Sequence, residues 1–139
     1  MGQARGHRLV PHTADVRIEA WAPDRAGCLA EAVTAMVESF ADLAGARLHA
    51  EREFRPPPAA DEDLLVAVLD EVIYRMETAD ELPLVTEVTD DAGGLRVRWG
   101  VTATGEVELT GAVPKAVSLH ELRFGGDDAG WSGAVTLDV

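Results

Sequence analysis

The chain has 139 residues, of which 12 are Lys or Arg and 25 are Asp or Glu, so its formal net charge is −13. A charge of this sign argues against direct nucleic-acid or membrane binding and favours a basic protein partner or a cation. The one cysteine, Cys28, excludes a multi-cysteine zinc site, and we expect it to be a buried structural thiol. Because the N-terminus has no apolar stretch typical of secretory signals, we expect a cytoplasmic protein.

The first half of the chain predicts the order strand, helix, strand, helix. Residues 12–21 alternate between apolar and polar side chains, which predicts a half-buried strand. Asp24 is a favoured residue type for the N-cap of the helix that follows. Residues 46–55 alternate loosely and predict an exposed strand. A second amphipathic helix is expected from Asp61, because acidic residues favour a helix N-terminus and an apolar stripe follows at helical spacing.

The second half of the chain returns to a period of two and predicts a meander of about five strands. Its segments are 84–88, 95–101, 107–109, 115–124 and 131–139, with a hairpin turn at 90–94. Two amphipathic helices packed on one mixed β-sheet with a single apolar face give an α+β fold, a two-layer sandwich. No linker or internal repeat divides the sequence, so we expect residues 1–139 to form a single domain.

Two aspartates are expected on the outer face of the predicted sheet. The alternation in the first strand places Asp15 away from the apolar side, and the alternation in the last strand does the same for Asp138. If these two strands are neighbours, both carboxylates and the chain-terminal carboxylate converge. Like charges at such a point need a cation or a proton, and an oxygen-liganded ion such as calcium or magnesium would serve. The alternative is that both aspartates are solvated acids.

Lys115 is the only lysine in a chain that otherwise uses arginine. An ammonium cannot be replaced by a guanidinium at a tight site, so its presence indicates either a specific role or chance. The histidines show no ligand spacing, and structural or surface roles are expected for most of them: His7, His12, His49 and His120. The exception is His12, three residues before Asp15 at the entrance of a strand.

Four segments together resemble the archease family. The segment His12–Val16 is similar to the N-terminal signature of that family, and Leu64–Glu71 to its second helix. Lys115–His120 resembles its lysine-containing strand, and Trp131–Val139 its closing strand, which ends in a hydrophobic-Asp-hydrophobic tripeptide. The segments occur in the expected order over nearly the whole chain. One departure is Ser118-Leu119, where the family usually has Thr-Tyr.

The resemblance implies a protein cofactor and not an enzyme. Archeases assist RtcB-type RNA-splicing ligases, which act in tRNA splicing and RNA repair with GTP and a divalent metal, by promoting guanylylation of the ligase and its repeated turnover. The resemblance maps a metal site to Asp15, Asp138 and Val139, the last through main-chain or terminal oxygens. Calcium is expected in the isolated protein, with magnesium or manganese as alternatives. Candidates for contact with the ligase or nucleotide are His12, Lys115 and His120.

Two other functions are open on the sequence alone. The first is a metal-dependent hydrolase with Asp15 and Asp138 as ligands, although no general base or nucleophile pair is evident. The second is a chaperone-like accessory protein for tRNA modification by a methyltransferase. Arg96 and Arg98 share one strand face, which indicates either an interface in a homo-oligomer or a solvated surface.

Overall fold

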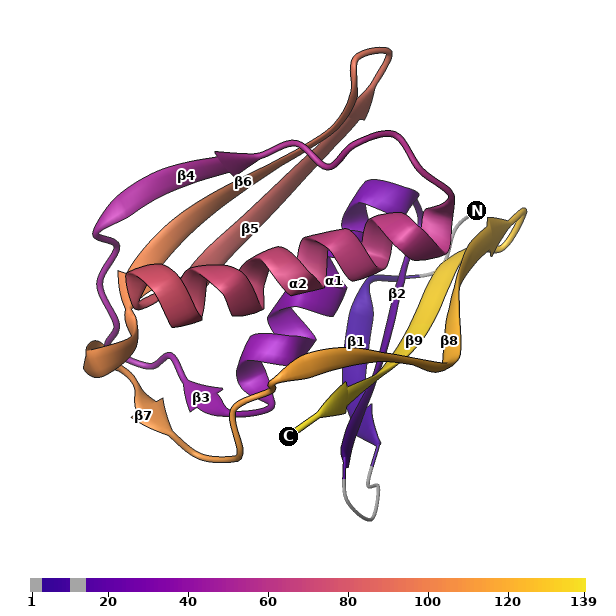
Figure 1. Ribbon diagram of the computed structural model, residues 1–139. Helices are drawn as coiled ribbons and strands as arrows, with labels where there is room; N and C mark the ends of the chain where they lie inside the picture. The colour runs from indigo at the N-terminus through magenta and orange to yellow at the C-terminus, as the bar shows by residue number, and fades with distance from the viewer. Residues whose placement is uncertain (1–3, 11–14) are drawn as a thin grey trace.

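Two helices lie between antiparallel sheets in the computed structural model, which describes residues 4–10 and 15–139 (Figure 1). The helices are α1 (Arg25–Glu38) and α2 (Asp61–Ala79). A four-stranded sheet contains, in spatial order, β1 (Gly6–Val10), β2 (Asp15–Ala22), β9 (Gly130–Asp138) and β8 (Ala116–Asp127). A three-stranded sheet contains β4 (Ala50–Phe54), β6 (Gly94–Ala103) and β5 (Glu81–Asp91). A short ribbon pairs β3 (Ala41–Asp42) with β7 (Glu108–Leu109), and a 3-10 turn, η1, spans Thr104–Glu106.

The predicted α+β class with two helices packed on sheet is confirmed, but the single mixed sheet is not. The strands are divided among three sheets, and their pairings within the described part of the chain are antiparallel. Helix α1 packs against both β2 and β5, and α2 against both β8 and β5, so the helices contact both large sheets. Alternation shows which side chains face a core, but it does not determine which strands pair. The division of the strands into three sheets could therefore not be predicted from it.

Both helix N-termini form as the sequence predicts. The backbone of Asp24 is extended, and its carboxylate accepts a hydrogen bond of 2.7 Å from the N–H of Gly27, which caps α1. Helix α2 has Asp61, Glu62 and Asp63 in its first turn, where their negative charges interact favourably with the positive end of the helix dipole. It ends at Asp80, which adopts a left-handed conformation with φ of 53°.

The hydrophobic core lies between the helices and the two large sheets. Trp99 of β6 is only 1% exposed, and its ring stacks on Phe54 with a centroid distance of 6.3 Å. The guanidinium of Arg75 lies 5.6 Å from the Trp99 ring centroid, a cation–π arrangement that joins α2 to the sheet. Cys28 is fully buried, and burial raises the pKa of its thiol to about 12, as expected of a structural and unreactive cysteine.

The alternation in β2 and β9 separates a core face from an outer face. Ile18 and Ala20 of β2 are buried towards the helices, as is Val135 of β9. The intervening residues, which include Asp15 and Asp138, therefore share the outer face, as the sequence predicts. No helix among the described residues combines the length and apolar character that a bilayer crossing requires.

Candidate functional site

Asp15 and Asp138 are direct cross-strand partners. Strands β2 and β9 pair antiparallel, and their register places the first residue of β2 opposite the last residue of β9. Side chains of residues directly opposite in such a ladder lie on the same face, with Cβ atoms about 4.5–5.5 Å apart. The condition on which the sequence-based interpretation depended, that the first predicted strand and the last are neighbours, is therefore met.

The neighbouring strand β8 fixes Asp138 from its other side. Ala116 is the cross-strand partner of Asp138, and the N–H of Lys115 donates a hydrogen bond of 2.7 Å to the main-chain oxygen of Asp138. Asp138 thus lies between β2 and β8 at the end of the sheet, and it is exposed. Val139 follows directly and is half-buried. The backbone of Lys115 is part of the same site.

Arg17 ties together the three strands next to the aspartate pair. Its guanidinium donates hydrogen bonds of 2.9 Å to Thr136 Oγ1 on β9 and 3.0 Å to the main-chain oxygen of Glu121 on β8. Glu121 belongs to a bulge in β8, between Ser118 and Arg123, where the register shifts and Glu121 has φ of 56°. No local sequence pattern predicts this role of Arg17, because its partners are more than 100 residues away along the chain.

The donor set at the aspartate pair suits a hard cation. Two facing carboxylates and nearby main-chain oxygens are ligands that calcium, magnesium and manganese prefer. Within residues 4–10 and 15–139, no cluster of three or more His, Cys, Asp or Glu side chains is arranged to hold a metal ion. A cation at Asp15 and Asp138 would therefore take its remaining ligands from main-chain oxygens, water or another molecule.

The other predicted contact residues have separate positions. His12 lies outside the described residues. His120 is in the β8 bulge, with its side chain 82% exposed and its Nε2 atom 3.4 Å from the carboxylate of the adjacent Glu121. Lys115 is also among the residues that line an apolar groove beside α2. Only the backbone of Lys115 is therefore shown to meet the aspartate pair.

A cluster that the sequence analysis missed joins β1 to α1. The ring nitrogens of His7 lie 2.7 Å from a carboxylate oxygen of Glu31 and 2.6 Å from one of Glu38. Arg5 donates a hydrogen bond of 2.9 Å to Glu31. Burial lowers the pKa of His7, but the hydrogen bonds to both glutamates outweigh it and raise the pKa above 6.5. Ligand spacing along the sequence does not indicate this cluster, because the partners of His7 are 24 and 31 residues away.

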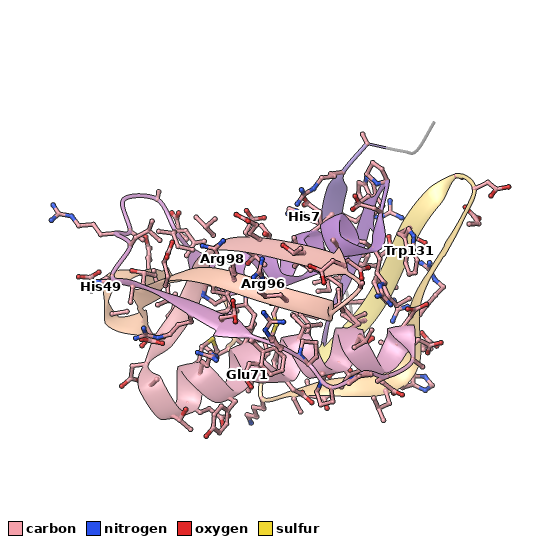
Figure 2. The ribbon with its side chains drawn as sticks, turned by 90° about the horizontal axis from the view of Figure 1, so that it is seen from above. His7, His49, Glu71, Arg96, Arg98 and Trp131 are labelled. Carbon is pink, nitrogen blue, oxygen red and sulfur yellow. The ribbon has the colours of Figure 1, made fainter. Side chains whose placement is uncertain are left out.

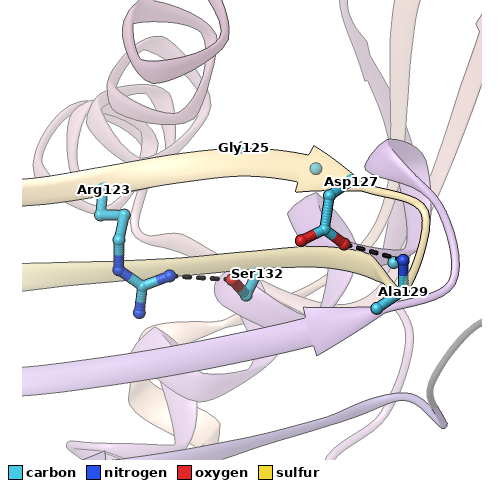
Figure 3. Close-up of a pocket in the computed structure, with 7 residues that line it drawn as sticks. Arg123, Gly125, Asp127, Ala129 and Ser132 are labelled. Carbon is cyan, nitrogen blue, oxygen red and sulfur yellow. Dashed lines mark hydrogen bonds between the residues drawn. The ribbon is translucent and has the colours of Figure 1, made fainter.

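A second cavity, of about 380 Å³, lies at the opposite end of the β8–β9 hairpin from Asp138 (Figure 3). Arg123 lines it and donates a hydrogen bond of 2.8 Å to Ser132 Oγ. Asp127 accepts one of 2.8 Å from the N–H of Ala129 in the turn. These side chains hold the hairpin together, so the residues that line this cavity have a structural explanation.

Arg96 and Arg98 lie on the three-stranded sheet (Figure 2). Each is close to a carboxylate: Arg96 Nε is 3.8 Å from Glu53, and an Arg98 nitrogen is 3.9 Å from Glu87. The Arg98 side chain is exposed, whereas the Arg96 Nε atom is buried and has no hydrogen-bond partner among the described residues. The predicted homo-oligomer stays a prediction.

Fold and site together define an α+β protein that brings two aspartates from opposite ends of its chain to one exposed sheet end. The sequence matches the family described as "Archease protein family (MTH1598/TM1083)" over residues 7–139. It is 52% identical over 138 residues to a protein named "Probable protein archease" from Mycobacterium tuberculosis, covering 99% of this chain and 77% of the relative. It is 26% identical over 140 residues to "Protein archease" from Archaeoglobus fulgidus, covering 96% of this chain and 98% of that one.

Two solved structures share the fold. Protein 1598 of Methanobacterium thermoautotrophicum superposes with a TM-score of 0.70 at 23% identity, over 96% of this chain and 99% of its own. A Thermotoga maritima protein described as "an archease, possible chaperone" superposes with a TM-score of 0.67 at 22% identity, over 95% and 96% of the two chains. The chain belongs to the archease family, as the resemblance of its four segments predicted.

Proposed function

We propose that this chain is a protein cofactor, and not itself an enzyme, that activates an RtcB-type RNA ligase in tRNA splicing or RNA repair in the cytoplasm. Membership of the archease family supports this function. The observation that carries it is the direct pairing of Asp15 with Asp138 at the exposed end of β2 and β9. Two aspartates directly opposite each other on neighbouring strands supply oxygen ligands of the kind that a hard cation prefers.

In this proposal Asp15, Asp138 and an oxygen of Val139 hold a divalent cation. Calcium fits the isolated protein, because it accepts six to eight oxygen ligands in flexible geometry, and magnesium or manganese are alternatives. Two side chains and one main-chain oxygen leave coordination positions open, so groups of the ligase or its nucleotide can complete the shell. When bound, the ion supplies positive charge that offsets the charge developing in phosphoryl transfer.

The remaining candidates provide contacts around this site. Lys115 is held beside the aspartate pair through its backbone, which is hydrogen-bonded to Asp138, and its ammonium is a candidate point charge for a phosphate of the ligase or nucleotide. His12 and His120 are candidates for contact with the ligase. The net charge of −13 favours docking beside a basic, RNA-binding partner, because complementary charge raises the rate of encounter.

A guanylylation assay tests the function. The cognate ligase is incubated with GTP and metal, with and without substoichiometric amounts of this protein, and we expect faster guanylylation and multiple turnovers in its presence. Asp15→Asn and Asp138→Asn should each reduce the activation by at least about tenfold, the scale of one lost charged contact. The matched control is Asp128→Asn, an exposed aspartate in the turn at the far end of the β8–β9 hairpin.

Each outcome decides between functions. Equal activation by the aspartate variants and the wild type would remove the cation site from the mechanism. No activation of a competent ligase by the wild type would reject the cofactor role. Stimulation of a tRNA methyltransferase instead would select the accessory-protein function, and metal-dependent hydrolysis of phosphoesters by the isolated chain would select the hydrolase.

A further inference from the structure

Arg17 is placed beside the candidate cation site by the same ladder that pairs Asp15 with Asp138. It lies two residues along β2 from Asp15, and its cross-strand partner is Thr136, two residues before Asp138 on β9. Residues two apart in a strand share a face, so these side chains all lie on the outer face of the sheet. Thr136 is 5% exposed, and its buried hydroxyl therefore needs a partner within the protein.

The guanidinium of Arg17 is that partner, and it also reaches the third strand. It donates hydrogen bonds of 2.9 Å to Thr136 Oγ1 and of 3.0 Å to the main-chain oxygen of Glu121 on β8. Glu121 has φ of 56°, a left-handed conformation that a residue other than glycine keeps only where its surroundings hold it. At its other end β8 holds Asp138, because the N–H of Lys115 donates a hydrogen bond of 2.7 Å to the main-chain oxygen of Asp138. These contacts join β2, β9 and β8 around the aspartate pair.

Asp15 and Asp138 form the last rung of the β2–β9 ladder. The ends of secondary-structure elements open more readily than their centres. A cation shared by two carboxylates needs both at a fixed spacing, and ligands that are held in place beforehand lose less conformational freedom when the ion binds. The next rung on the outer face, which contains Arg17 and Thr136, is positioned to hold the aspartates in register.

We infer that Arg17 is a positioning residue for the cation site: its two hydrogen bonds hold β2, β9 and β8 in the arrangement that lets Asp15 and Asp138 bind one ion. The inference rests on the proposed function, in which these aspartates bind a divalent cation. The charge of Arg17 does not serve this role, since a positive charge near the site disfavours a second cation. The role requires the planar fork of the guanidinium, which can donate to two acceptors at once, and a lysine ammonium does not supply that geometry.

Calcium binding by the isolated protein tests the inference with variants that leave the net charge unchanged. Arg17→Lys keeps the positive charge but loses the fork, and Thr136→Val keeps the shape of the side chain but removes the acceptor. We expect each variant to weaken calcium binding, measured by isothermal titration calorimetry, by about tenfold, the lower end of the usual cost of losing a hydrogen-bonding partner around a metal site. The double variant R17K/T136V should lose no more than Arg17→Lys alone, because the two changes remove the same hydrogen bond. Circular dichroism without calcium confirms that each variant is folded.

The matched control is a second arginine–hydroxyl pair on the same sheet. Arg123 of β8 donates a hydrogen bond of 2.8 Å to Ser132 Oγ on β9, towards the end of the hairpin that lies away from Asp138. Arg123→Lys and Ser132→Ala remove the fork and the hydroxyl there, and both should bind calcium as the wild type does. An equal loss in these controls would overturn the inference, because it would reflect a general loosening of the sheet.

The outcomes separate this inference from the proposed function. Unchanged calcium binding by Arg17→Lys and Thr136→Val would overturn the positioning role and leave the cation site intact. Tighter binding by Arg17→Met, with no loss in Arg17→Lys, would also overturn it, because the charge of Arg17 would then be its only effect. If the wild type binds no calcium, or if D15N/D138N binds it equally well, the cation site itself fails and this inference fails with it.

Discussion

Two pairs of carboxyl-bearing residues in this molecule are brought together from distant parts of the sequence, and they lie in different surroundings. Between β1 and α1, the ring of His7 lies between Glu31 and Glu38, within 2.7 Å of each. At the end of β2 and β9, the register places the carboxyl-bearing residues Asp15 and Asp138 directly opposite each other. The first pair encloses a cation that belongs to the chain.

The comparison sets a structural cluster beside the proposed cation site. A cationic ring between two carboxylates satisfies all three groups inside the fold, so this cluster joins β1 to α1 and needs nothing from outside. In the proposed function, Asp15 and Asp138 instead bind a cation from solution. The predictions below test this distinction, beginning with the largest expected effect.

Removing the aspartate pair should abolish stabilisation by calcium. If Asp15 and Asp138 bind the ion, calcium at 100 times its Kd should stabilise the wild type by about 2.7 kcal/mol, which is several degrees in Tm. A chelator should reverse the shift. The double variant D15N/D138N should show no shift, as measured by differential scanning calorimetry with and without calcium. A calcium response that survives in the double variant would place the cation elsewhere.

Removing His7 should lower stability without affecting the calcium response. His7→Ala deletes two charged hydrogen bonds and leaves Glu31, whose side chain is only 16% exposed, with Arg5 alone. We expect the free energy of unfolding to fall by roughly 2 kcal/mol. Urea denaturation measures it.

The control for this prediction is His49→Ala. His49 and Glu106 also form a pair, at 2.5 Å, but their side chains are 47% and 45% exposed. Solvent screens such a pair, so the change should be much smaller than that of His7→Ala. Equal costs for the two histidine variants would mean that the His7 cluster is no more than a surface pair.

Local sequence rules predict much of this fold. Asp24 as an N-cap and the acidic first turn of α2 follow from helix-end chemistry, and both are confirmed. The alternation in β2 and β9 correctly places Asp15 and Asp138 on one face, because side chains in a strand point alternately to opposite sides. The shared face of the two aspartates in the candidate site can therefore be predicted from two short segments of the sequence.

Features that depend on pairing between distant segments could not be read in this way. Strand β1 was missed because Gly6–Val10 shows little alternation, and its Gly6 serves to admit the ring of Trp21, which a Cβ atom would meet at 2.4 Å. The β8 bulge depends on Arg17, which holds the main-chain oxygen of Glu121 from another strand. The His7 cluster has the same cause, since no local pattern links it to α1.

The His7 cluster should also make stability fall as pH rises. Because the pKa of His7 is raised above 6.5 in the folded protein, its contribution is complete below pH 6.5, while Glu31 and Glu38 stay ionised, and is lost as pH rises through the folded-state pKa. Arg5, which also contacts Glu31, keeps its charge throughout. The stability difference between the wild type and His7→Ala should therefore shrink by about 1 kcal/mol between pH 6 and 9. Urea titrations across this range measure it, and a constant difference would contradict the cationic state of His7.

A third cluster, around Arg25, sharpens the comparison because its cation does not titrate. Arg25 donates hydrogen bonds of 2.8 Å to Asp61 at the start of α2 and of 2.8 and 2.9 Å to Asp90 near the end of β5. These hydrogen bonds outweigh burial and hold the pKa of Asp90 below its ordinary 3.8. Like the His7 cluster, this cluster takes its cation from the chain itself.

The contribution of the Arg25 cluster to stability should be lost in acid and not in base. A carboxyl group with a lowered pKa in the folded state stabilises above pH 3.8, and the contribution disappears as pH falls through the folded-state value. Asp90→Asn should cost about 0.5–1 kcal/mol at pH 7, because the pair is partly exposed, and progressively less below pH 4. The difference should not change between pH 6 and 9, where His7→Ala changes. Alkaline sensitivity of Asp90→Asn would show that the two clusters are not independent, since Arg25 stays charged over that whole range.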